Sequence, residues 1–218
     1  MPTTALRIVH TVAGPPLARL LRPAVTGSDR LPRFGGLLLA ANHVSNLDNY
    51  VLSAVCPRPV AFLGKQELTE GLFGVFNLAM GMIPVDRGSG DLSAVQRIAD
   101  LLAAGDAIAL FPEGTRSPTG ELFRFRSGIA RIAHLAATPV VPVGLRGTAT
   151  VWPRGRGPVP RRPRAGALEV RFGAPLPPPA DATPRTRRQW TDALRVAVAA
   201  LSGQQLADTF APVDHDDR

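Results

Sequence analysis

The 218-residue sequence predicts a single α/β domain, built on a mixed, largely parallel β-sheet flanked by helices. Three observations support this prediction. Short apolar runs alternate along the chain with longer helix-like segments, which is the pattern of β-α-β units. Hydrophobic residues make up 45% of the chain, in the range of globular proteins. The chain is long enough for one sizeable core, and its length is most simply that of one domain.

Residues 1–30 are predicted to form an N-terminal segment of two short amphipathic helices, divided at Gly14-Pro15-Pro16 because proline interrupts a helix. Such helices suit an interfacial membrane anchor, and equally a pair of helices packed on the domain. The predicted domain then spans residues 31–203, and the tail, residues 204–218, is expected to be flexible.

The remaining elements follow from apolar periodicity. Strands are predicted at residues 37–41, 60–63, 82–85, 107–111, 140–145 and 167–172. Helices are predicted at residues 50–55, 69–80, 91–104, 127–137 and 187–201. Pro84 favours an edge position for the third strand, because proline cannot donate to a hydrogen-bond ladder. Residues 151–163, dominated by proline, glycine and arginine, are predicted to form an irregular surface loop.

Composition excludes several kinds of site. The only cysteine, Cys56, cannot form an internal disulfide, and the four widely spaced histidines lack the spacing of zinc ligands. We therefore expect no metal. No run approaches the ~18 consecutive apolar residues of a membrane-spanning helix, and no signal peptide is visible, so an intracellular protein is expected.

The chain is strongly basic, with a formal net charge of +8 and a calculated pI near 11.3. Five arginines lie within eleven residues that contain no acid: Arg154, Arg156, Arg161, Arg162 and Arg164. Such a patch suits an anionic membrane surface, an acidic carrier protein or nucleic acid, and it is also compatible with a solvated loop. Nucleic acid is the weakest of these partners, because the patch lacks interleaved aromatic residues for base stacking.

The stretch Asn42-His43-Val44-Ser45-Asn46-Leu47-Asp48 stands where the predicted strand at 37–41 gives way to a helix. Open α/β sheets place their chemistry at the carboxyl ends of such strands. A histidine there can take a proton near neutral pH, and a carboxylate five residues on can orient and stabilise it. We therefore predict that His43 and Asp48 are a general base and its orienting acid.

A purely structural interpretation of the same stretch stands beside this prediction. Ser45-Asn46-Leu47-Asp48 fits the capping-box pattern, in which the acid reaches back to the backbone N–H of the capping serine. On this interpretation Asp48 only begins a helix, and His43 is a hydrogen-bonded structural residue.

A second set of candidate residues lies in Phe111-Pro112-Glu113-Gly114-Thr115-Arg116-Ser117, directly after a predicted strand. The turn would present Glu113, Thr115 and Arg116 at the same sheet edge as His43. A guanidinium group is suited to a phosphate because its planar fork donates two hydrogen bonds at once. For any one of these residues alone, a surface turn with an incidental ion pair is the alternative.

Two further cations accompany this turn. Arg87 follows the predicted strand at 82–85, and Arg126 stands just before the helix at 127–137, whose amino terminus also favours anions. Together with Arg116 they predict a site for an anionic group.

Taken together, these stretches resemble the glycerolipid acyltransferase superfamily, the family of lysophosphatidic acid acyltransferases. Its first block, Asn-His-x4-Asp, is met by Asn42, His43 and Asp48. The following blocks are matched in order by Gly81 to Arg87, Phe111 to Ser117 and Val141 to Leu145. Lys65 and Arg126-Ser127-Gly128 also fit, with Arg126 where Lys is commoner.

The resemblance implies transfer of a fatty acyl group from acyl-CoA or acyl-carrier protein, as co-substrate, to the sn-2 hydroxyl of lysophosphatidic acid, giving phosphatidic acid. His43 and Asp48 would form the general-base dyad, and no cofactor is implied. Substrate binding is expected of the other motif residues: Asn42, Lys65, Arg87, Glu113, Gly114, Thr115, Arg116 and Arg126.

The implied partners are the acyl donor, the lysophospholipid acceptor and an anionic membrane surface. The expected location is cytoplasmic, peripheral to the inner face of the cell membrane. Three alternatives stay open: the same chemistry on glycerol 3-phosphate, a lysophospholipid or another lipid; a thioester hydrolase; and a basic nucleic-acid-binding module.

Overall fold

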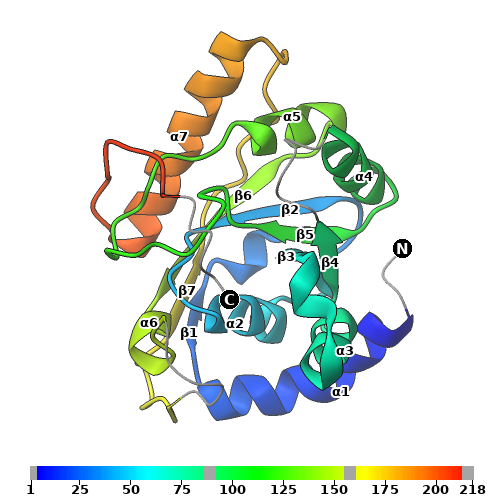
Figure 1. The fold of residues 1–218 in the computed structure, drawn as a ribbon, viewed down its shortest axis with the longest axis vertical. Coiled ribbons are helices and arrows are strands. Elements are labelled where there is room, and N and C mark those ends of the chain that lie inside the picture. Colours follow the sequence, from blue (N-terminus) through cyan, green and yellow to red (C-terminus); the bar gives the residue numbers. More distant parts are fainter. Residues whose placement is uncertain (1–3, 86–91, 155–160, 213–218) are drawn as a thin grey trace.

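A computed structural model describes residues 4–85, 92–154 and 161–212. Within them, one sheet lies between two layers of helices (Figure 1). Its strands are β1 (Ala24–Thr26), β2 (Leu37–Ala41), β3 (Val60–Lys65), β4 (Met82–Val85), β5 (Ala107–Leu110), β6 (Val140–Arg146) and β7 (Glu169–Phe172). The helices are α1 (Thr4–Leu21), α2 (Leu47–Val55), α3 (Gly71–Ala79), α4 (Leu92–Ala103), α5 (Gly128–Leu135), α6 (Thr148–Val151) and α7 (Pro184–Ser202), with short 3-10 turns at Ser28–Arg30 and Gln66–Thr69.

The sheet confirms the predicted mixed, largely parallel architecture. The strand order is β1-β7-β6-β2-β5-β3-β4, and every neighbouring pair is parallel except β6 and β7. β4, which contains Pro84, is an edge strand as expected. Because β2 and β5 are parallel neighbours, their carboxyl ends meet at one edge of the sheet, and the two predicted site segments follow these ends.

β2 is the centre of the core, and all of its side chains are buried. Leu37, Leu39 and Ala41 pack into one apolar cluster with residues of α2. Leu38 and Ala40 pack into a second cluster on the opposite face, with residues of α4, α5 and α7. The strand therefore reads as a continuous apolar run because both of its faces are covered.

The N-terminal segment differs from its prediction. One helix, α1, runs from Thr4 to Leu21 and includes Pro15 and Pro16, where two short helices were expected. Tertiary packing overrides the local preference, because Leu6 and Leu21 are buried near the two ends of α1 and His10 Nε2 donates to the Cys56 carbonyl oxygen at 2.9 Å. No helix within the described residues is long and apolar enough to cross a membrane.

The C-terminal tail differs from its prediction as well. Up to residue 212 it packs on the domain: Ala207 and Ala211 are buried against Phe123, and Leu206 forms a parallel bridge with Leu122. Figure 1 shows this segment, in red, beside the green loop that precedes α5. The Ala207 N–H donates to the Leu122 carbonyl oxygen, and the Gln205 and Thr209 carbonyl oxygens accept from N–H groups of that loop, partners that a tail in solvent would not have.

Candidate active site

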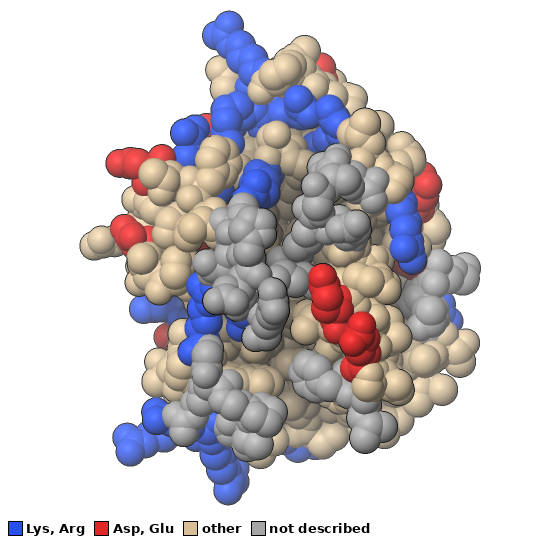
Figure 2. All heavy atoms as spheres, viewed as in Figure 1, with Lys and Arg blue, Asp and Glu red and all other residues tan. Residues whose placement is uncertain are grey.

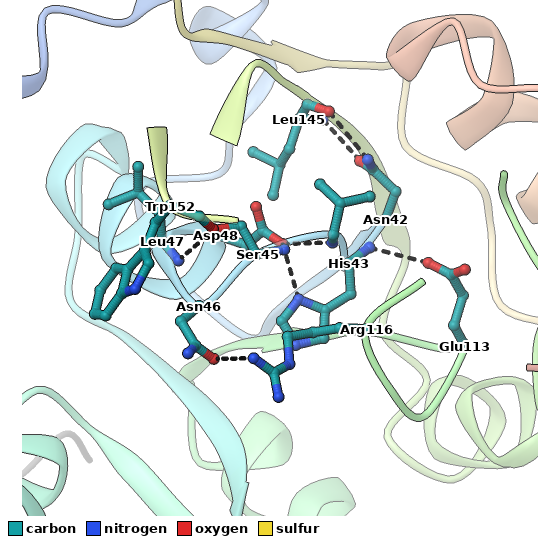
Figure 3. A network of polar contacts seen from close by, with 11 residues as sticks. Asn42, His43, Ser45, Asn46, Leu47, Asp48, Glu113, Arg116, Leu145 and Trp152 are labelled. Carbon is teal, nitrogen blue, oxygen red and sulfur yellow. Dashed lines mark hydrogen bonds and ion pairs between the residues drawn. The ribbon is translucent and has the colours of Figure 1, made fainter. Parts of the chain in front are cut away.

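His43 lies in the loop between β2 and α2, at the carboxyl edge of the sheet (Figure 3). Its ring stacks on Phe111, the residue after β5, with ring centroids 4.0 Å apart. Its Nδ1 is 2.8 Å from Oδ2 of Asp48. Because the carboxylate accepts this hydrogen bond, Nδ1 carries the proton and Nε2 has a free lone pair. Nε2 has no hydrogen-bond partner within the described residues, so it can accept a proton from a bound molecule.

Asp48 is fully buried in the first turn of α2. Its Oδ2 accepts three hydrogen bonds, each 2.8 Å long, from the backbone N–H groups of Val44 and Ser45 and from the ring of His43. The backbone contacts fix the carboxylate, and the carboxylate fixes the imidazole. The geometry suits a base and its orienting acid.

The capping interpretation also describes part of this geometry. The Ser45 N–H donates to Asp48, as in a capping box, and the Ser45 hydroxyl accepts from the Leu47 N–H at 3.0 Å. The same hydroxyl donates to the Trp152 carbonyl oxygen at 2.6 Å, beyond α6. Asp48, in the first turn of α2, therefore uses one oxygen both to bind the loop before the helix and to hold His43.

Asn42 was expected among the substrate contacts, but the structure buries it completely. Its amide nitrogen donates to the Leu145 carbonyl oxygen at 3.0 Å, and its amide oxygen accepts from the Leu145 N–H at 2.7 Å. These paired bonds tie the end of β2 to β6. In this structure Asn42 holds the strand end that carries His43, and its side chain is fully enclosed by protein.

Glu113 was expected to face substrate too, and it is also fully buried. One carboxylate oxygen accepts from the His43 N–H at 2.9 Å and the other from the Phe123 N–H at 3.0 Å. Burial raises the pKa of Glu113 to about 7; the negative charge of Asp48 adds to the rise, while the two N–H donors and the positive charge of Arg195 oppose it. Glu113 is thus enclosed by protein and links the backbone of Phe123 to the backbone of His43.

Arg116 and Arg126 approach the site from the turn after β5 and from the start of α5. Arg116 Nη1 donates to Asn46 Oδ1 at 3.0 Å, within the loop that also holds His43 (Figure 3). Gly114 adopts φ +83°, and a Cβ there would stand 2.7 Å from Arg126 Nε, so the arginine passes closely over the glycine. Thr115 is partly buried in the same turn.

Two predicted cations have no described side chain. Lys65 is the last residue of β3, which neighbours β5, but its side chain lies outside the described part of the structure. Arg87 lies outside the described residues altogether.

Phe111 and Arg195 are the residues that sequence analysis gave no role. Phe111 stood inside a recognised string, but only the fold brings its ring against His43. Arg195, on α7, is 9% exposed and lies between Leu194 and Val198, which are fully buried. The sequence does contain one signal for Arg195: it lies on the apolar face of a predicted helix, and a buried cation requires hydrogen-bonding or charged partners.

A cavity of about 830 Å³ lies at the opposite, amino-terminal edge of the sheet, beside α1. Its lining includes Arg7, Arg33 and Arg58 and none of the candidate catalytic side chains. No group of three or more His, Cys, Asp or Glu side chains suited to a metal ion occurs in the described part of the chain.

The family model described as acyltransferase matches residues 22–146, more than half of the chain. The chain belongs to the acyltransferase family. The matched region of this acyltransferase-family chain contains His43, Asp48 and the turn with Arg116, and the match confirms the resemblance found in the sequence motifs.

Three relatives are similar to this chain over more than half of its length. A 1-acyl-sn-glycerol-3-phosphate acyltransferase of Chlamydomonas reinhardtii is 30% identical, over 84% of this chain and 53% of the relative. An enzyme of the same name from Borreliella burgdorferi is 29% identical over 57% of this chain and 51% of its own. The human 1-acyl-sn-glycerol-3-phosphate acyltransferase alpha is 29% identical over 72% of this chain and 56% of its own. The chain thus spans about half the length of the curated relatives it matches.

A solved structure shares the fold of this acyltransferase-family chain. The crystal structure of PlsC from Thermotoga maritima, described as a 1-acyl-sn-glycerophosphate (LPA) acyltransferase, superimposes with a TM-score of 0.71. The alignment covers 90% of this chain and 78% of that one, at 24% sequence identity. At this identity the likeness establishes the architecture of sheet and helices.

Proposed function

We propose that this protein transfers a fatty acyl group from acyl-CoA or acyl-carrier protein to the sn-2 hydroxyl of lysophosphatidic acid, giving phosphatidic acid. The names of the relatives support the substrate class. The observation that carries the proposal is the pairing of His43 Nδ1 with Asp48 at 2.8 Å, beside a turn that carries Arg116. This arrangement provides a base for a hydroxyl and a cation for the acceptor phosphate.

The proposed reaction needs one proton acceptor. His43 Nε2 takes the proton of the sn-2 hydroxyl while that oxygen attacks the thioester carbonyl carbon. Asp48 stabilises the imidazolium that forms. The C–S bond then breaks as the C–O ester bond is kept, and the departing thiolate takes the proton from His43. No second acid is required, because a thiolate is a good leaving group.

The acceptor is positioned by cations. Arg116 and Arg126 would hold its phosphate, with Lys65 and Arg87 as further candidates, so that its hydroxyl lies against His43. Such positioning matters as much as basicity, since a well-placed hydroxyl can reach an effective molarity of ~10⁵ M or more.

We also propose that the protein works at the cytoplasmic face of a membrane as a peripheral protein. α1 exposes Ile8, Val12 and Leu20, at 57%, 68% and 53%, and these apolar side chains can enter the interface between lipid and water. The net charge of +8 favours an anionic surface.

An acceptor panel tests the proposed reaction. Purified protein is given palmitoyl-CoA, or palmitoylated acyl-carrier protein, with lysophosphatidic acid, glycerol 3-phosphate or lysophosphatidylcholine, and products are identified by mass spectrometry. We expect phosphatidic acid from lysophosphatidic acid, and none from the His43→Ala variant. Acylation of another acceptor alone would establish that alternative, and thioester loss without any acceptor would establish a hydrolase.

A further inference from the structure

Residues 204–212, named here the C-terminal strap, are bound to the loop that precedes α5. The Leu122 N–H donates to the Gln205 carbonyl oxygen, and the Ala207 N–H donates back to the Leu122 carbonyl oxygen, at 2.8 and 3.0 Å. The Arg124 N–H donates to the Thr209 carbonyl oxygen at 2.9 Å. The strap therefore pairs with residues 122–124 as a short strand would.

The side chain of Arg195, on α7, binds both the strap and that loop. Its Nη2 donates to the Leu122 carbonyl oxygen at 2.7 Å and also to the Ala207 carbonyl oxygen. The side chain reaches out from α7, which lies outside the segment matched by the family model. A single buried guanidinium thus holds both partners of the pairing.

Glu113 connects the same loop to the base. Its carboxylate accepts from the Phe123 N–H and from the His43 N–H, and it lies close enough to Arg195 for the positive charge to favour its ionised form. The contacts therefore run without a gap from the strap and Arg195, through residues 122 and 123 and Glu113, to the backbone of His43.

We propose that Arg195 and the C-terminal strap are positioning elements for acyl transfer: they hold residues 122–124, so that the Phe123 N–H stays on the Glu113 carboxylate and this carboxylate anchors the backbone of His43. The proposal rests on the proposed function of His43 as the base. None of these groups touches substrate. Their effect reaches the reaction through the position of the imidazole.

The link between the strap and His43 depends on the protonation state of Glu113. Both of its oxygens accept from backbone N–H groups, and protonation would place a hydrogen on one of these acceptors. The charged groups that face it are Asp48 from α2 and Arg195 from α7, and the titratable residue in contact with it is His43, through its backbone N–H. With burial raising its pKa to about 7, Glu113 gains a proton as pH falls through neutrality, and the anchor of His43 weakens.

Stability and activity should respond to this proton in opposite directions. The pKa of Glu113 is higher in the folded chain than its ordinary value of 4.5. Its contribution to stability is therefore present below the unfolded pKa and declines as pH rises towards about 7. Activity, in contrast, should rise over this window as the carboxylate forms. Protonation of the base His43 would also lower activity at low pH, so the contribution of Glu113 is the part of the pH profile that changes in Glu113→Gln.

The first test compares Arg195→Met with Arg185→Met, an exposed position on the same helix. In Arg195→Met we expect kcat at pH 7 to fall about ten- to hundred-fold with little change in KM, the size of effect that displaced catalytic groups produce. The acidic midpoint of kcat should move to higher pH, because Glu113 loses the cation that favours its charge. Arg185→Met should match the wild type in both respects.

Arg195→Lys separates charge from geometry. Lysine retains the positive charge but not the planar fork, so the acidic midpoint should stay near that of the wild type while kcat falls less than in Arg195→Met. In a Glu113→Gln background, Arg195→Met should no longer shift the midpoint, because the group that it tunes is gone. A shift that persists in that background would overturn the proposal.

A readout independent of activity is the hydrogen exchange of the His43 amide, measured by NMR. We expect Arg195→Met, and a chain ending at Gly203, to speed exchange at His43 and Phe123 in variants that remain folded. If these variants lower only the melting temperature and leave both the pH profile and this exchange unchanged, the proposal is wrong. If the wild type transfers no acyl group but the exchange still depends on Arg195, the proposed function fails and the contact network stands.

Discussion

Asp48 combines two tasks in a single carboxylate oxygen. Oδ2 accepts from the backbone N–H groups of Val44 and Ser45, in the loop just before α2, and also from the ring of His43. The backbone hydrogen bonds therefore hold in place the same carboxylate that orients His43, without a further side chain. A loss of activity at Asp48 is informative only beside a variant that disturbs the cap and leaves the imidazole alone.

Ser45 provides that comparison. We expect Asp48→Asn to lower kcat by about 10²-fold or more, because the imidazolium loses its counter-charge. Ser45→Ala removes the hydroxyl that accepts from the Leu47 N–H and donates to the Trp152 carbonyl oxygen, and should cost about 1–3 kcal/mol of stability, with kcat nearly unchanged. Steady-state kinetics and thermal melts of both variants decide the matter. If kcat falls in both only in proportion to lost folded protein, Asp48 is a cap and nothing more.

Arg116 is the cation whose contact with the histidine loop is described. We expect Arg116→Ala to raise KM for a phosphorylated acceptor about tenfold or more, while KM for palmitoyl-CoA changes little, because a charged hydrogen bond to phosphate is lost. Arg97→Ala, at an exposed position of α4, is the matched control and should change neither constant. An equal rise in both KM values would argue against a phosphate contact.

At the scale of elements, the turn after β5 depends on a backbone that only glycine adopts readily. Gly114 and Gly120 have φ of +83° and +87°, so an alanine at either position is strained. Only at Gly114 would the new Cβ meet Arg126, at 2.7 Å from Nε; at Gly120 nothing lies within 4 Å. The two positions separate backbone strain from displacement of the arginine.

This pair yields a prediction. We expect Gly114→Ala and Gly120→Ala to lose similar stability, about 1 kcal/mol or more from the positive φ. Gly114→Ala should in addition raise KM for the acceptor about tenfold, because Arg126 must move away. Thermal melts and acceptor titrations measure the two effects. Equal KM values in the two variants would show that Arg126 does not bind the acceptor.

The strands and helices of the central domain were predictable because their apolar periodicity is strong. β2 is buried on both faces, and α4 ends at Ala103, two residues before Gly105, which adopts φ +92° as a helix terminator does. β1 was not predictable: it has three exposed residues and is an edge strand that pairs with β7. The single helix across Pro15 and Pro16 also depends on tertiary contacts that local sequence does not express.

The same division holds within the site. The His43 and Asp48 pair could be predicted because spacing along one chain segment brings the two side chains together. The bridging role of Glu113 could not, because it depends on Phe123 and Arg195, which only the folded loop and α7 bring near. A motif identifies the residue type that a site contains, whereas burial decides whether that residue faces substrate or the backbone.

For the whole molecule, the proposed membrane contact would use both charge and exposed apolar side chains. Lys and Arg side chains lie at the lower edge of the face in Figure 2, the edge along which α1 runs in Figure 1. The apolar side chains of α1 supply a second, salt-independent attraction, because buried apolar area does not depend on ionic strength. A membrane contact that uses both should weaken with salt without disappearing.

The α1 contact can be tested by sedimentation with lipid vesicles. We expect wild-type protein to bind vesicles of phosphatidylcholine with phosphatidylglycerol, and to bind more weakly, but measurably, at high salt. The double variant Ile8→Ser/Val12→Ser should bind about tenfold or more weakly at both salt concentrations, since each substitution removes apolar area from the contact. Val196→Ser, which alters a 57% exposed valine on α7, is the matched control and should bind like the wild type.

Both side chains of the double variant are exposed on α1, so a lost contact should leave the melting temperature near that of the wild type. If the double variant binds as tightly as Val196→Ser, α1 packs on the domain without entering a membrane.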